Sequence, residues 1–280
     1  MKTYHYTSGE GLFGILNSSK LRLTNQNFLN DPSEISYANQ LILETLKENK
    51  EINDIHSSLF NESALNTMIA PFDLYIASFS KNPDSLDMWN YYSKGNGYCI
   101  EFELNEFLKN NISIENLSLQ TFDIIYNQEE QIEKIKKLIT DFSDDSKEYE
   151  QLTINVQNVG EETEYYNLEY KRDQIILRFN EELWKLKMQL KNKAYEREQE
   201  VRIVASELKY ERNTSEYRVN SSGLIIDFIS LNFELEKTVK SISLHPLSGE
   251  IHHLGLSNFI QNKFKNKLSI TKSKIPFREI

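Results

Sequence analysis

Residues 74–104 read LYIASFSKNPDSLDMWNYYSKGNGYCIEFEL, and this stretch decides the fold. Its first part, LYIASFS (74–80), is a short apolar run that predicts a buried strand. The segment PDSLDMWNYY (83–92) has a proline near its start and predicts a helix. The segment GYCIEFEL (97–104) alternates apolar and polar residues and predicts a second strand. A strand, a helix and a strand in so short a stretch indicate that sheet and helices pack together.

Patterns typical of strands and of helices recur on both sides of this stretch. Further strands are predicted over residues 3–7, 21–24, 119–126, 199–206, 223–229, 238–244 and 268–275. Further helices are predicted over residues 12–16, 32–49, 50–68 and 249–264. Pro32 and Ser33, within Asn30-Asp31-Pro32-Ser33-Glu34, predict a turn that starts the second of these helices. Irregularly alternating helices and strands indicate an α+β fold with a mixed or antiparallel sheet.

Residues 127–192 differ from the rest because they are rich in Glu, Lys and Gln. They carry a stripe of apolar residues spaced by four, four, three and four positions, which are Ile175, Phe179, Leu183, Leu186 and Leu190. That spacing predicts an amphipathic helix. We expect the region to be a helical insertion packed on a single domain that spans residues 1–280, with a partner-binding helix as the alternative.

The composition restricts the class of protein. The chain has 280 residues, 39% of them hydrophobic, which is enough for a sizeable core. A formal net charge of -10 argues against general attraction to nucleic acid or anionic lipid, although a local basic pocket remains compatible with it. Cys99 is the single cysteine, so no internal disulfide forms. With no signal peptide and no long apolar run, we expect a cytoplasmic protein without a membrane partner.

Several common sites are disfavoured. The chain contains no G-x-G-x-x-G or G-x-x-x-x-G-K-[ST] loop, which argues against Rossmann and P-loop folds. No G-x-S-x-G elbow appears. His245, His252 and His253 lack the spacing of metal ligands, so we expect no metal.

Five short motifs occur in a fixed order. They are Tyr4-His5-Tyr6-Thr7-Ser8, Phe28 to Glu34, Ser78-Phe79-Ser80 leading to Met88-Trp89-Asn90-Tyr91-Tyr92, Glu198-Gln199-Glu200-Val201-Arg202, and Lys274-Ile275-Pro276-Phe277-Arg278. Each motif alone is weak, but together they resemble the domain-of-unknown-function family 2971. The resemblance runs from Tyr4 to Arg278.

That family in turn resembles the ADP-ribosyltransferases. This second resemblance implies a split or mixed β-sheet with NAD as the substrate. It implies that His5 is the first site residue, that Trp89 or Tyr92 is the aromatic one, and that Glu198 or Glu200 is the acid. Glu198-Gln199-Glu200 resembles the Glu-x-Glu turn of one branch of those enzymes. One departure is that Glu200 begins a strand-like EVRIV run.

The carboxylates suit the chemistry. Cleavage of the nicotinamide–ribose bond passes through an oxocarbenium-like ion, which a nearby carboxylate stabilises. On an extended strand Glu198, Glu200 and Arg202 would share one face. One carboxylate would then hold the ribose while the other accepts the acceptor's proton, and Arg202 would pair with the pyrophosphate or with a glutamate. The alternative is a solvated strand face of alternating charge.

The expected binding residues each have a structural alternative. His5 either donates to a ribose hydroxyl or packs in the core, and its neighbour Tyr6 is also expected to bind the cofactor. Trp89 and Tyr92, three residues apart, either stack on nicotinamide or form core. Ser80 either contacts the cofactor or fixes a turn.

We expect His5, Trp89 and Glu200 to line one cleft. At least two cations should point into it to hold the pyrophosphate. The candidates are Arg22, Lys193, Arg202 and Arg278.

The resulting expectation is an NAD-dependent ADP-ribosyltransferase that modifies an unidentified macromolecule, either protein or nucleic acid. By family analogy it would be a bacterial toxin or a phage-defence effector. The alternatives are an NAD glycohydrolase, in which water is the acceptor, and a non-catalytic module that senses a nucleotide. The sequence leaves the oligomeric state open.

Overall fold

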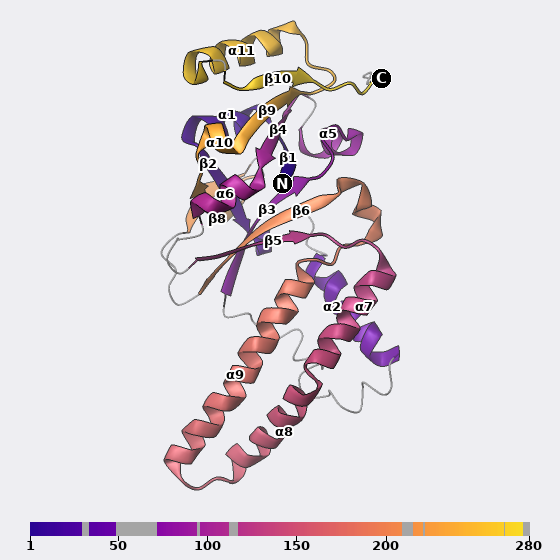
Figure 1. The fold of residues 1–280 in the computed structure, drawn as a ribbon, viewed down its shortest axis with the longest axis vertical. Coiled ribbons are helices and arrows are strands. Elements are labelled where there is room, and N and C mark those ends of the chain that lie inside the picture. Colours follow the sequence, from indigo (N-terminus) through magenta and orange to yellow (C-terminus); the bar gives the residue numbers. More distant parts are fainter. Residues whose placement is uncertain are drawn as a thin grey trace. The chain divides into compact units, whose positions relative to one another are not determined.

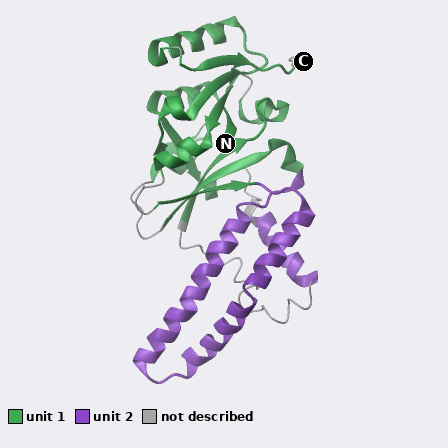
Figure 2. Cartoon of the chain, in the orientation of Figure 1, with its two compact units in different colours: residues 1–29, 73–123, 194–280 green, residues 30–72, 124–193 purple. Residues whose placement is uncertain are grey.

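The computed structural model describes residues 1–29, 34–48, 72–93, 96–111, 117–208, 215–220, 222–265 and 267–276. By their internal contacts the residues group into two compact units (Figure 2). Unit 1 contains residues 1–29, 73–123 and 194–280, and unit 2 contains residues 30–72 and 124–193. Among the described helices, none has an apolar stretch long enough to cross a membrane.

Unit 1 is an α+β structure built on a large sheet (Figure 1). Its strands are β1 (Lys2–Thr7), β2 (Lys20–Asn25), β3 (Phe72–Ser80), β4 (Tyr98–Glu103), β5 (Leu117–Asp123), β6 (Glu200–Leu208), β7 (Glu216–Val219), β8 (Ile225–Asn232), β9 (Val239–Leu244) and β10 (Ser269–Lys272). Its helices are α1 (Gly9–Ser18), α5 (Leu86–Tyr92), α6 (Leu104–Asn111), α10 (Leu235–Thr238) and α11 (Glu250–Phe264). The short 3-10 helices η1 (Gln26–Phe28) and η2 (Lys193–Glu198) precede α2 and β6.

The described strands form one open, mixed sheet. Its main path runs in the order β10-β9-β4-β1-β3-β2-β8-β7. β9 and β10 are parallel, whereas β4, β1, β3, β2, β8 and β7 follow as antiparallel neighbours. The sheet branches at β3, because β6 also pairs with β3 and carries β5 on its other side. β3 therefore has three neighbours along its length.

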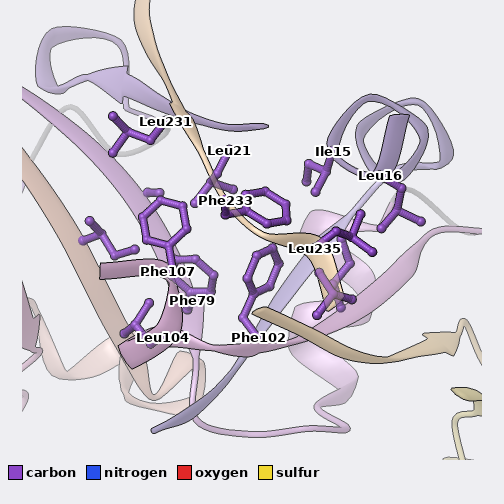
Figure 3. Close-up of a cluster of buried hydrophobic side chains, with 14 of the residues drawn as sticks. Ile15, Leu16, Leu21, Phe79, Phe102, Leu104, Phe107, Leu231, Phe233 and Leu235 are labelled. Atoms are coloured by element: carbon purple, nitrogen blue, oxygen red, sulfur yellow. The ribbon is translucent and has the colours of Figure 1, made fainter. Parts of the chain in front are cut away.

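One face of this sheet carries the main core, which we call the core face; the opposite face is the outer face. Leu21 and Leu23 of β2 alternate with Arg22, so the two leucines enter the core and the arginine lies on the outer face. Phenylalanines from β3, β4, α6 and the segment between β8 and α10 meet at the centre of this core (Figure 3). They are Phe79, Phe102, Phe107 and Phe233, and successive rings pack edge-on or tilted with centroids 5.4 to 6.1 Å apart.

The outer face of β1 and β4 is covered by helix α5. Ser85 caps that helix, since its side chain accepts a hydrogen bond from the Met88 backbone N–H. Met88 and Trp89 of α5 pack on Tyr6 of β1 and Cys99 of β4 in a second, smaller core cluster. Burial raises the pKa of the Cys99 thiol, as expected for a core cysteine.

Unit 2 is helical and has its own core. Its helices are α2 (Glu34–Glu48), α7 (Gln128–Asp141), α8 (Ser143–Asn158) and α9 (Glu162–Lys187). α8 and α9 lie side by side as an antiparallel pair (Figure 1). The stripe predicted between Ile175 and Leu190 is buried throughout, and it packs against residues of the other three helices. The apolar residues of the amphipathic stripe thus pack in the core of unit 2.

Most predicted elements are confirmed to within a few residues, and so is the α+β class with a mixed sheet and packed helices. Helix α6 and strand β7 were not predicted. The turn over residues 30–33 and the helix over 50–68 lie outside the described residues. Residues 127–192 are helical as expected, whereas their packing on a single domain stays a prediction.

The phenylalanine cluster generates a stability prediction. Phe102 has no exposed surface and packs against the rings of Phe79 and Phe233, so Phe102→Ala should leave a cavity that the core cannot close. We expect the free energy of unfolding to fall by about 3 to 5 kcal/mol, measured by urea denaturation.

Phe13→Ala is the matched control, because Phe13 of α1 is 56% exposed. Its cost should stay below about 1 kcal/mol. Equal losses in the two variants would show that the described core does not carry the stability of unit 1.

Candidate functional site

Two of the sequence motifs meet where η2 passes into β6. The Ser80 hydroxyl donates to the backbone oxygen of Glu198 at 2.7 Å. One residue further on, the Lys81 N–H donates to the Gln199 oxygen at 2.9 Å. The Tyr92 hydroxyl donates to Oε1 of Glu198 at 3.0 Å. The end of β3 is thereby bonded to the backbone of Glu198 and Gln199, and helix α5 is bonded to the Glu198 side chain.

The backbone at Gln199 corrects the expected arrangement of the two glutamates. Gln199 has φ 44°, in the left-handed region that is uncommon for residues other than glycine. Glu198 ends η2, and β6 begins only at Glu200. The prediction that Glu198 and Glu200 share one face of an extended strand is therefore wrong. A non-glycine residue held in this conformation between two acids is the kind of strain that recurs at functional sites.

Glu200 and Arg202 form a buried ion pair. Arg202 Nε donates to Oε1 of Glu200 at 2.7 Å, and Nη2 donates to Oε2 at 3.0 Å. The two side chains are only 5% and 2% exposed. Both alternate with Val201 and Ile203, which enter the main core, so the pair lies on the outer face. The shared face predicted for Glu200 and Arg202 is confirmed, and the guanidinium fork is occupied by the carboxylate.

Trp89 is a structural residue in this conformation. It has no exposed surface, and its ring stands edge-on to Tyr6 at 4.9 Å and to His245 at 5.4 Å. Its indole N–H donates to Oδ1 of Asp84 at 2.7 Å. A ring enclosed in this way has no exposed face on which nicotinamide could stack. Of the two expected aromatics only Tyr92, which is half-buried, keeps exposed surface.

Tyr6 and Ser80 also have structural contacts. The Tyr6 hydroxyl donates to the Asn82 carbonyl at 2.9 Å and accepts from the Ser85 N–H at 3.0 Å. Burial raises the pKa of Tyr6, so the phenol stays protonated. Ser80 accepts from the Asn82 N–H at 3.0 Å in addition to its bond to Glu198, and it has no exposed surface. These contacts favour the turn-fixing alternative for Ser80.

Asp84 joins this region to the carboxyl-terminal motif, and the sequence analysis missed it. Its Oδ1 accepts from Trp89 and from the Ser273 hydroxyl at 2.6 Å, and its Oδ2 accepts from the Lys274 N–H at 2.9 Å. Ile275 packs against the Tyr6–Trp89 cluster. The available signal was Pro83-Asp84-Ser85 directly before a helix, because aspartate and serine there commonly satisfy open N–H groups.

His5 lies on the other face of the sheet. Its ring packs against Phe79 at 5.5 Å and Phe102 at 6.4 Å, both in the main core. Nδ1 contacts the Ser78 carbonyl oxygen at 3.1 Å, so Nδ1 carries the hydrogen. Burial lowers the pKa of His5 and favours the neutral ring. In that tautomer Nε2 accepts rather than donates, so the expected donation to a ribose hydroxyl from Nε2 is not available.

The single cleft lined by His5, Trp89 and Glu200 is therefore not formed by these side chains. His5 faces the core, whereas Trp89 and Glu200 lie on the outer face and Trp89 is enclosed. The described cations that were expected there take different places. Arg202 pairs with Glu200, Arg22 lies over the Phe228 ring and Lys193 is exposed. Arg278 lies outside the described residues.

The arrangement that remains is a cluster on the outer face that centres on Glu198. It joins the Tyr92–Glu198 hydrogen bond, the Ser80 turn and the Glu200–Arg202 pair, and we call it the Glu198 cluster. The family described as "Protein of unknown function (DUF2971)" matches residues 88–203. This match confirms the resemblance to family 2971 over that range, which holds Tyr92, Glu198 and Arg202 but not the motifs at either end of the chain. No curated protein and no solved structure matches the chain.

The buried ion pair generates a second stability prediction. Arg202→Met would leave the Glu200 carboxylate buried without its fork, so the free energy of unfolding should fall by about 3 to 5 kcal/mol. The double variant Arg202→Met/Glu200→Leu should lose less than the sum of the two single variants, because it removes both members of the pair together.

Arg178→Met is the control for the ion pair. Arg178 forms a surface pair with Asp145 at 2.8 Å and is 59% exposed, so its loss should cost below about 1 kcal/mol. Additive effects of the Arg202 and Glu200 substitutions would contradict the described coupling.

His5 generates a pH prediction. Because burial lowers its pKa below the ordinary 6.5, the unfolded chain binds this proton more readily than the folded chain. The free energy of unfolding should therefore fall as the pH drops below about 6.5, and His5→Gln should reduce that loss. Urea denaturation at about pH 7 and about pH 5 measures the change in the free energy of unfolding. His253→Gln, on the exposed side of α11, is the control. A His5→Gln variant with the wild-type pH dependence would show that His5 is not buried in its neutral form.

Proposed function

We propose that this protein is an NAD-dependent enzyme of the ADP-ribosyltransferase type, in which Glu198 is the acidic catalytic residue. The observation that carries the proposal is the hydrogen bond from Tyr92 to Glu198, beside a backbone strained at Gln199. It brings together an aromatic residue and an acid that the family resemblance expects at the same site, although they lie far apart in the sequence. Glu198 takes this role because it is the acid that Tyr92 contacts, whereas the carboxylate of Glu200 contacts Arg202.

The chemistry follows from the position of the carboxylate. The bond from ribose C1′ to the nicotinamide nitrogen breaks, its electron pair leaves with neutral nicotinamide, and positive charge develops on the ribose. The Glu198 carboxylate stabilises that charge electrostatically, and the Tyr92 hydroxyl fixes the carboxylate's orientation before the reaction begins. The acceptor nucleophile then bonds to C1′ and releases its proton to a base.

The Glu200–Arg202 pair supports this site as a positioning element. Its two hydrogen bonds hold the first residues of β6 in place, and the Ser80 and Lys81 hydrogen bonds hold the residues just before them. Glu198 is thus held at its own carbonyl oxygen and at the residues that follow it. Preorganisation of this kind avoids reorganisation when charge develops on the substrate.

The sheet is compatible with the proposed fold family. ADP-ribosyltransferases have a split sheet, and here the sheet branches at β3 into a β2 side and a β6 side. The Glu198 cluster lies at the start of β6, close to that branch. We propose a protein or nucleic acid as the acceptor and, by family analogy, a role as a bacterial toxin or phage-defence effector in the cytoplasm.

The direct test is nicotinamide release from NAD by purified protein, with and without a cell lysate as a source of acceptors. Glu198→Gln should lower the rate by about 10² or more, because it removes the charge and keeps the shape. Tyr92→Phe should lower it less, since the carboxylate remains but loses its orienting hydroxyl.

Glu196→Gln is the matched control, because Glu196 is an exposed acid of the same 3-10 helix. Wild-type release by Glu198→Gln would remove Glu198 from the mechanism. Release of free ADP-ribose without a labelled macromolecule would identify a glycohydrolase instead. Saturable NAD binding without any release would identify a nucleotide-sensing module.

A further inference from the structure

Two arginines from different strands lie over one buried aromatic ring. The guanidinium carbon of Arg22, on β2, is 4.9 Å from the centroid of the Phe228 ring, on β8. The guanidinium carbon of Arg218, on β7, is 6.0 Å from the same centroid. Strand pairing sets Thr24 opposite Phe228 and Arg218 opposite Ile226, so these side chains share the outer face. We call Arg22, Arg218, Thr24 and Phe228 the two-arginine cluster.

The cluster holds two positive charges without a carboxylate. Neither Arg22 nor Arg218 forms an ion pair with any residue that the structure describes. Arg218 donates to the Thr24 hydroxyl at 3.4 Å, and its Nε is buried without a partner in the described part of the chain. Burial and the charge of Arg22 both lower the pKa of Arg218, which reflects the repulsion between the guanidinium groups.

This arrangement is unusual for so acidic a chain. The sequence has 42 acidic residues against 32 basic ones, so a carboxylate partner would be easy to supply. The acid nearest in the strand pairing is Glu216, set opposite Phe228; it is exposed and has no ion pair with a described residue. A buried donor left unsatisfied and two like charges side by side both cost free energy, and an anion between the guanidinium groups would remove both costs.

We propose that the two-arginine cluster is a binding site for phosphate groups. A guanidinium presents paired N–H donors that match two phosphate oxygens, and two guanidinium groups held near each other suit one phosphate or pyrophosphate. Phe228 is 3% exposed and supports the guanidinium groups from below, so it offers no surface for stacking a base. Recognition is therefore by charge and hydrogen bonding. The site uses β2, β7 and β8 and does not depend on the proposed role of Glu198.

The phosphate has two sources, a free nucleotide or the phosphodiester backbone of a nucleic acid. The net charge of -10 favours a small ligand, because long nucleic acids would meet repulsion beyond the cluster. The experiment uses sodium pyrophosphate as one probe in isothermal titration calorimetry. A fluorescent single-stranded oligothymidylate in an anisotropy titration is the other probe.

We expect wild-type protein to bind pyrophosphate, and Arg22→Gln and Arg218→Gln each to weaken that binding by about tenfold or more. Arg22→Lys should restore part of the affinity, because it keeps the charge and loses the fork. Arg178→Gln, a surface arginine of unit 2, and Glu198→Gln should both bind as the wild type does. Circular dichroism confirms that each variant is folded.

The outcomes separate cleanly. Pyrophosphate binding that depends on both arginines, with no oligothymidylate binding, supports the site and assigns it to free nucleotides. Oligothymidylate binding that depends on both arginines supports the site and assigns it to a phosphodiester backbone. The proposal would be overturned if the wild-type protein binds neither probe. It would also be overturned if Arg22→Gln and Arg218→Gln leave the binding unchanged. A loss of pyrophosphate binding in Glu198→Gln would contradict the independence of the two sites.

Discussion

The buried Glu200–Arg202 pair is the constraint on which the candidate site depends. Two opposite charges with almost no exposed surface remain in a folded chain only if each satisfies the other. Their two hydrogen bonds fix neighbouring side chains at the start of β6, directly after the point where Ser80 and Lys81 bond to Glu198 and Gln199. The strained backbone at Gln199 is tolerated because the residues on both sides are held.

The sequence predicted the positions of the helices and strands better than it predicted which face of each strand meets the core. Alternation along LRLT and TYHYT shows which residues share a face, but it does not say which face meets the core. His5 packs with Phe79 on the core face, while Tyr6 and Trp89 form the cluster under α5 on the outer face. The alternatives in which these aromatic motifs are core are the ones that the structure favours.

The parts of the site that the sequence did not predict have identifiable causes. Glutamine has no preference for positive φ, so no local signal marked the turn at Gln199. Two partners of Asp84, Ser273 and Lys274, lie 189 and 190 residues further along the chain, and a single sequence carries no trace of such contacts. β7 is short and mostly polar, so Arg218 could not be placed beside Arg22 before the strand pairing was known.

The interruption of unit 1 by unit 2 has a consequence for how the protein is made. Unit 2 ends at residue 193, so a ribosome completes all of its helices before it reaches β6, β8 or β9. During that interval β2 lacks β8, β4 lacks β9, and β3 lacks β6. Nascent chains thus expose unpaired strand edges and the Phe79–Phe102 core while the helical unit is already able to form. Dependence on chaperones during synthesis should accordingly concentrate in the sheet.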